Sequence, residues 1–78
     1  MIIADTNNNR ILRLNKGNNE VEVIAGGNGS GSGLNQLDKP FGIVQDHEGN
    51  IVICDYYNNR IVKWVPGASQ GEIVVNYT

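Results

Sequence analysis

The chain has 78 residues, a formal charge of −2 and 40% apolar residues. This apolar share is too high for an obligately disordered chain, and six basic against eight acidic residues leave no broad cationic surface for nucleic acid. A single cysteine, Cys54, excludes an internal disulfide, a four-cysteine zinc site and a CxxC redox pair. The sequence shows no apolar run long enough to predict a secretory signal or a membrane anchor.

Short runs rich in β-branched residues predict seven strands and no helix. Turn-forming residues separate these runs, and the longest interruption is the glycine-rich segment 26–40. Several runs are apolar on both faces, so we expect small sheets packed against sheets, each covered on both sides. In chain order the expected strands are 2–4, 10–14, 21–25, 41–45, 51–54, 60–65 and 72–77.

The chain repeats itself with a period of 50 residues. When residues 2–25 are aligned with residues 52–75, no gap is needed and eight positions are identical. A repeat of this length predicts an architecture built from similar supersecondary units. The identical pairs are Ile3/Ile53, Asp5/Asp55, Asn8/Asn58, Asn9/Asn59, Arg10/Arg60, Ile11/Ile61, Gly17/Gly67 and Glu22/Glu72.

Three motifs follow one another in the second half of the chain: PFGI at 40–43, DHEGN at 46–50 and DYYNNRI at 55–61. The last recurs as DTNNNRI at 5–11. In order and spacing these motifs resemble the NHL repeat of β-propellers. The resemblance implies an all-β fold of antiparallel four-stranded blades, each a meander, that is incomplete in one chain. The implied organisation is the last three strands of one blade at 2–25, an inter-blade connector at 26–40 and a complete four-stranded blade at 41–77.

The implied number of blades has a consequence for assembly. A propeller closes with about four to eight blades, and about three repeat units are usually needed to bury their faces. Since this chain holds fewer than two, we expect a fragment of a longer propeller or a truncated or engineered piece. The alternatives are a self-associating chain and a lone twisted meander. The expected partners are therefore additional blades or further copies, with a protein, peptide or glycan as possible ligand.

The motif that occurs twice, at 5–11 and 55–61, should form a corner between two strands, and we call it the corner motif. It offers two sets of polar residues. A carboxylate ahead of an asparagine pair can accept backbone N–H groups, asparagine tolerates left-handed backbone, and arginine can pair with aspartate. Because the motif occurs in both repeats, we interpret it as a structural corner, with ligand contact as the alternative. The two sets are Asp5, Asn8, Asn9 and Arg10, and Asp55, Asn58, Asn59 and Arg60.

The binding candidates are positions that differ between the two corners or lie in the connector. Thr6 and Asn7 in the first corner become Tyr56 and Tyr57 in the second. Exposed tyrosines bring rigid contact area and a hydroxyl, although packing between blades is the alternative interpretation. The remaining candidates, expected near the tyrosines, are Asn35 and Gln36.

Loop placement follows from the meander, because its successive connections alternate between the two ends of a sheet. Both corners and the connector 26–40 should therefore share one end. The hairpin around His47 and the turn 66–71 should lie at the other end.

No catalytic residue, cofactor or metal ligand is expected. The glycine-rich run 26–33 lacks the lysine and the following helix of a phosphate loop, so it predicts a flexible connector. The turn 46–50 lacks the ligand spacing of a calcium loop. His47 and Cys54 fall on different parts of the implied blade, so no nucleophile–base pair is expected.

The resemblance leaves two other functions open. One is a piece of a metal-dependent propeller lyase or lactonase. The other is an RNA-binding NHL domain, against which the near-neutral charge of the shared loops argues.

Overall fold

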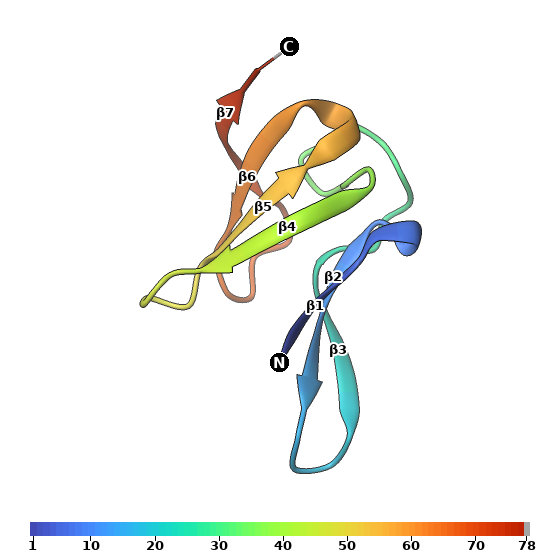
Figure 1. The fold of residues 1–78 in the computed structure, drawn as a ribbon, viewed down its shortest axis with the longest axis vertical. Coiled ribbons are helices and arrows are strands. Elements are labelled where there is room, and N and C mark those ends of the chain that lie inside the picture. Colours follow the sequence, from blue (N-terminus) through green and yellow to red (C-terminus); the bar gives the residue numbers. More distant parts are fainter. Residues whose placement is uncertain (78) are drawn as a thin grey trace.

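The computed structural model describes residues 1–77, which form two antiparallel sheets (Figure 1). The strands of each sheet are neighbours in chain order, so each sheet is a meander. This confirms the all-β class. The first sheet contains β1 (Ile2–Asp5), β2 (Arg10–Asn15) and β3 (Glu20–Gly26). The second contains β4 (Pro40–Gln45), β5 (Ile51–Asp55), β6 (Arg60–Trp64) and β7 (Glu72–Asn76).

All seven predicted strands are confirmed, with ends that shift by one residue. Within the described range the corners also contain two single-turn 3₁₀ helices that the sequence did not predict, η1 (Thr6–Asn8) and η2 (Tyr56–Asn58). The N–H of the asparagine that follows each helix donates to the carbonyl of the first helical residue, Thr6 or Tyr56, at 3.2 Å. The backbone of that asparagine is left-handed, with φ of 57° at Asn9 and 52° at Asn59. The expected tolerance of asparagine for this backbone is therefore used in both corners. No helix among these residues is long and apolar enough to cross a membrane.

The 50-residue repeat extends to the pairing of the strands. In the first sheet Ala4 pairs with Ile11, and Ile11 pairs with Ala25. Fifty residues on, Cys54, Ile61 and Val75 form the same row in the second sheet. Each last strand also has a register shift immediately after this row, where one extra residue, Ile24 or Val74, forms a bulge.

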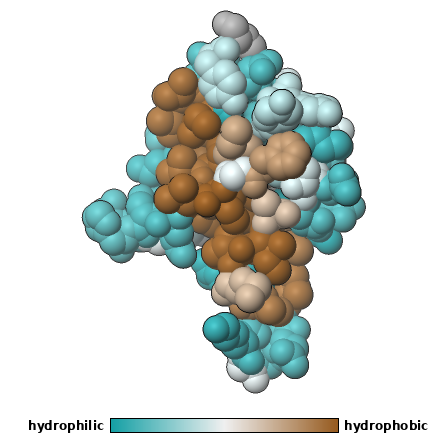
Figure 2. All heavy atoms as spheres, viewed as in Figure 1, coloured by the Kyte–Doolittle hydropathy of each residue, from teal (hydrophilic) through white to brown (hydrophobic). Residues whose placement is uncertain are grey.

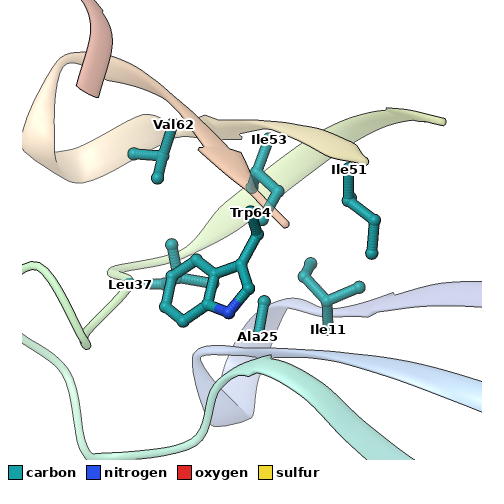
Figure 3. Close-up of a cluster of buried hydrophobic side chains, with 7 residues drawn as sticks. All are labelled: Ile11, Ala25, Leu37, Ile51, Ile53, Val62 and Trp64. Carbon is teal, nitrogen blue, oxygen red and sulfur yellow. The ribbon is translucent and has the colours of Figure 1, made fainter. Parts of the chain in front are cut away.

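The hydrophobic core lies between the two sheets. Figure 3 shows its side chains pointing toward one another from both sheets, with Leu37 added from the connecting segment. The indole N–H of Trp64 donates to the carbonyl oxygen of Ala68 at 3.0 Å, so the ring is buried without losing a hydrogen bond. The core residues are Ile11, Ala25, Leu37, Ile51, Ile53, Val62 and Trp64.

Only one face of each sheet is covered within the chain. In β5, buried Ile51, Ile53 and Asp55 alternate with half-buried Val52 and Cys54. The expectation that each sheet is covered on both sides is therefore not met within one chain, because each of the two sheets can cover only one face of the other. An apolar band accordingly shows on the surface, extending from the second sheet onto the first (Figure 2).

The segment between β3 and β4 runs along the corner end of both sheets (Figure 1). The expectation of a flexible connector did not include the hydrogen bonds that this segment makes. The Gln36 amide accepts from the Gly33 N–H at 3.0 Å and donates to the Asn28 carbonyl at 3.1 Å. The segment also reaches the 66–71 turn that was expected at the opposite end, since Gly71 N–H donates to the Leu34 carbonyl at 2.8 Å.

Candidate functional site

The second corner is built on a buried ion pair. Arg60 Nε donates to Asp55 Oδ2 at 2.7 Å, and the two side chains are 6% and 0% exposed. Asn58 Nδ2 donates to the same carboxylate oxygen at 2.9 Å. A buried pair of this kind needs further hydrogen bonds on its remaining polar atoms.

The connecting segment supplies those hydrogen bonds through its main chain. Asp55 Oδ1 accepts the N–H of Asp38 at 2.7 Å, and Asn58 Nδ2 also donates to the Gly31 carbonyl at 2.7 Å. Within residues 1–77 no buried side-chain nitrogen or oxygen lacks a partner. The terminal nitrogens of Arg60 donate to the carbonyls of Ser32, Gly33 and Gln36 at 3.1, 2.9 and 3.0 Å.

The first corner repeats the ion pair without the covering segment. Arg10 Nε donates to Asp5 Oδ2 at 2.8 Å, and Asn8 Nδ2 lies 3.1 Å from both oxygens of Asp5. These side chains are far more open than their counterparts, at 38% for Arg10 and 24% for Asp5. The hydrogen bonds from Arg10 and then Asn8 hold the pKa of Asp5 below its ordinary value of 3.8.

Each corner thus has two sides. We call Asp5, Asn8 and Arg10, with their counterparts in the second corner, the carboxylate side. The other side, which we call the trailing side, contacts the start of β4 in the first corner: Thr6 Oγ1 donates to the Pro40 carbonyl at 2.7 Å, and Asn9 Oδ1 accepts the Lys39 N–H at 2.9 Å. The trailing side of the second corner consists of Tyr56 and Asn59, which are both exposed.

Three aromatic rings gather beside the second corner. The ring centroids of Tyr56 and Tyr57 are 5.6 Å apart, and Phe41 meets Tyr56 edge to face at 5.3 Å. All three are more than half exposed. The sequence reasoning missed Phe41, although the pairing of β4 with β5, which places Pro40 opposite Asp55, brings it to this corner.

The other binding candidates divide into two kinds. Asn7 and Asn35 are exposed. Thr6 and Gln36 use their side chains in the contacts already described, with Pro40 and within the connecting segment. The segment does reach the tyrosines, because the Tyr57 N–H donates to the Asp38 carbonyl at 3.1 Å. A binding role for these residues stays a prediction.

Two further groups have shifted pKa values, one in the hairpin 46–50 and one beside Cys54. In the hairpin, burial works to raise the pKa of Asp46, but the hydrogen bonds from Asn50 and Glu48 outweigh it and lower that pKa. Cys54 Sγ lies 3.6 Å from the Tyr77 hydroxyl, and this hydrogen bond raises the pKa of Tyr77. In the part of the chain that the structure describes, no three His, Cys, Asp or Glu residues lie together as a metal site.

Two comparisons with known proteins found no match. No protein-family model matches this chain, and no curated protein matches it significantly. The functional interpretation therefore rests on the motifs, registers and contacts of the chain itself.

Proposed function

We propose that this chain is a non-catalytic β-propeller segment of the NHL type, and that it acts as a scaffold for binding protein, peptide or glycan partners. Its first partner is a second copy of the chain, docked head to tail. The proposal rests on how the 50-residue repeat is distributed over the covered and open faces of the two sheets. The residues that pack in one sheet recur, fifty residues away, on the open face of the other sheet.

The first half of this repeat concerns the row Ala4, Ile11 and Ala25. This row faces the core, and Ala25 is only 2% exposed. The counterpart row on the second sheet has the same register but faces outward, so that Val75 at its end is 48% exposed. The outward face of the second sheet therefore has the pattern of a surface that packs against another sheet.

The second half of the repeat is the converse. Ile53, Val62 and Trp64 of the second sheet are buried in the core, and their counterparts Ile3, Leu12 and Leu14 belong to the outward face of the first sheet. Ile3 is 38% exposed, whereas its counterpart Ile53 is fully buried. Within the chain, the face that carries Ala4 packs against the face that carries Ile53. Between two copies, the outward face of the second sheet would pack in the same way against the outward face of the first sheet of the other copy.

This arrangement joins two different surfaces. Such a heterologous contact leaves one surface of each type free, so it closes into a ring or continues as an open chain. Burial of apolar side chains drives the association, at roughly 25 cal/mol per Å² of apolar surface removed from water.

The test is the absolute mass of the purified chain by light scattering over a dilution series, with far-UV circular dichroism on the same samples. We expect multiples of the 8.5 kDa monomer. Ile3→Glu blocks one surface and Val75→Glu blocks the other, so each variant alone should be monomeric. Their equimolar mixture should form dimers, because one intact surface of each type remains.

The control is Leu34→Glu, which places the same charge at an exposed apolar residue outside both sheets. It should assemble like the unsubstituted chain. A monomeric, β-rich chain at the highest concentration would contradict self-association, and so would a mixture of the two blocked variants that stays monomeric.

A further inference from the structure

We propose that the carboxylate side of the first corner, formed by Asp5, Asn8 and Arg10, is a binding site for the main chain of a glycine-rich peptide segment. This inference deepens the proposed function, because it assumes that the chain is an interaction segment. It concerns a different contact, however, made by polar groups at the corner rather than by the apolar sheet faces.

The second corner demonstrates what this arrangement of side chains binds. Arg60 gives one N–H to Asp55 and its terminal nitrogens to three backbone carbonyls, while Asn58 binds a fourth. The free oxygen of Asp55 accepts a backbone N–H. The ion pair is thus the base of a small site that holds residues 31–38 by the main chain.

The first corner has the same base already formed. Its arginine–aspartate distance is 2.8 Å against 2.7 Å in the second corner, and its asparagine also donates to the carboxylate, although to both oxygens instead of one. Both corners leave their 3₁₀ turn through a left-handed asparagine. Because Asp5 already orients the guanidinium of Arg10, a ligand would meet donors whose direction is fixed, which lowers the entropic cost of binding.

The arginine and backbone groups that hold the peptide in the second corner are open in the first. Among residues 1–77, the terminal nitrogens of Arg10 donate to no protein atom, and the carboxylate of Asp5 accepts hydrogen bonds only from the side chains of Asn8 and Arg10. The backbone N–H of Asn7 corresponds to that of Tyr57, which binds the Asp38 carbonyl. The first corner therefore presents the donors for several consecutive carbonyls without a segment bound to them.

Charge selects the kind of ligand. The carboxylate of Asp5 lies directly beside the Arg10 guanidinium and balances its charge, which disfavours a free anion. Neutral carbonyl oxygens, together with one N–H for the carboxylate, match both members of the pair. We therefore assign the site to polypeptide main chain and not to phosphate.

The segment bound in the second corner defines the shape of the ligand. A Cβ at Gly31 or Gly33 would crowd the Gln36 amide, so a larger residue at either position would push that amide away from its hydrogen bonds with Gly33 and Asn28. Leu37, which follows, is buried in the core cluster that also contains Ile53 and Val62. The ligand is accordingly a glycine-rich turn followed by a leucine, for which the outward face of the first sheet offers the counterparts of those two apolar residues.

The probe is a blocked synthetic peptide with the sequence of residues 29–40, GSGSGLNQLDKP. It is titrated into the full-length Val75→Glu chain labelled with ¹⁵N, so that the outcome does not depend on self-association. We expect saturable shifts of the Arg10 side-chain Nε–H and of the Asn7 amide, with the Arg60 Nε–H unchanged. A peptide carrying Leu37→Ser should bind more weakly, because it lacks the apolar side chain.

Substitution of the arginine separates this site from general peptide adhesion. Arg10→Ala should weaken binding by about tenfold or more, the loss expected for charged hydrogen bonds. Arg10→Lys should recover little of it, because an ammonium group cannot reproduce the planar fork of donors. The matched control is Arg13→Ala, which removes a half-buried arginine 3.8 Å from Glu22, outside the corner, and should leave the affinity unchanged.

Three results would overturn the inference: no saturable shift at millimolar peptide, equal affinity of the Arg10→Ala chain, or shifts centred on Arg60, which would mean displacement of the chain's own segment. Titration with inorganic phosphate gives a fourth, since saturable binding at Arg10 would make the site an anion site. The titration uses a chain that is expected to be monomeric, so its result can be interpreted even if the chain does not self-associate. The two proposals can therefore fail separately.

Discussion

Arg10 and Arg60 show how far identical residues can differ in environment. Both follow the same Asp–Asn–Asn spacing and both pair with the aspartate five positions earlier. The sequence predicted this pairing, because the corner is local. It could not predict that only Arg60 is buried, since the atoms that cover it belong to residues 24–28 positions away in the chain.

Removal of each arginine should therefore have unequal effects. Arg60→Ala leaves Asp55 buried without its partner, and we expect a loss of about 3–5 kcal/mol in the free energy of unfolding. Arg10→Ala should cost far less, because water replaces the guanidinium at an open corner. Urea unfolding of the two variants measures the difference, and equal losses would contradict the structural role assigned to the second corner.

The aspartate of the first corner predicts a pH dependence. Its pKa is depressed in the folded chain by Arg10 and Asn8, so the stability that it contributes is present above the ordinary value of 3.8 and is lost as the pH falls through the lower, folded value. We expect the melting temperature to decline below about pH 4. Asp5→Asn should reduce that decline without abolishing it, because the depressed pKa of Asp46 acts in the same range. Thermal unfolding between pH 7 and pH 2.5 checks this, and an unchanged decline would contradict it.

At the scale of elements, the strands were predictable and the details of their pairing were not. Short β-branched runs between turn formers locate all seven strands, because that signal is local. The bulges at Ile24 and Val74 depend on cross-strand pairing and have no such signal. The segment between β3 and β4 was the least predictable part, because its glycine content predicted a flexible connector and gave no sign that Asn58 and Arg60 bind its main chain.

The turn before β7 depends on the absence of a side chain at one position. A Cβ at Gly71 would collide with Val62 and come within 2.7 Å of the Trp64 ring. We expect Gly71→Ala to lower the free energy of unfolding by about 1–3 kcal/mol through overpacking. The control is Gly17→Ala, whose Cβ would meet only Asn15 Oδ1 at 3.5 Å and which should change stability by under about 0.5 kcal/mol. Comparable losses in both variants would contradict close packing at Gly71.

At the scale of the whole molecule, two sheets share one core and leave two unlike faces open. The period of 50 residues and the resemblance of the motifs to a propeller repeat were readable in the sequence. The face left open by each sheet was not, because the apolar pattern is the same on covered and uncovered strands. The candidate site was predictable only in part: the sequence indicated exposed tyrosines at the second corner, whereas the place of Phe41 beside them depends on the pairing of β4 with β5.

The tyrosine pair should matter for association more than for folding. Both rings are more than half exposed, so replacing Tyr56 and Tyr57 with serine should change the free energy of unfolding by under about 1 kcal/mol. Tyr56 lies on the open trailing side, whose counterpart Thr6 contacts Pro40 within the chain, so the same change should shift assembly to higher protein concentration. Light scattering and urea unfolding of the double variant test both halves, with Leu34→Ser as control. A large loss of stability with unchanged assembly would reverse the interpretation.

The hydrogen bonds between Arg60 and the glycine-rich segment also determine how fast a protease can cleave this molecule. Residues 27–39 are mostly small and polar, which is typical of a segment that proteases cleave. A protease binds its substrate as extended main chain, through the carbonyl and N–H groups. Here several of those groups are already bonded to the second corner. Cleavage in the segment must therefore wait for that corner to open, so the rate of nicking reports a local opening of the fold and not the accessibility of the loop.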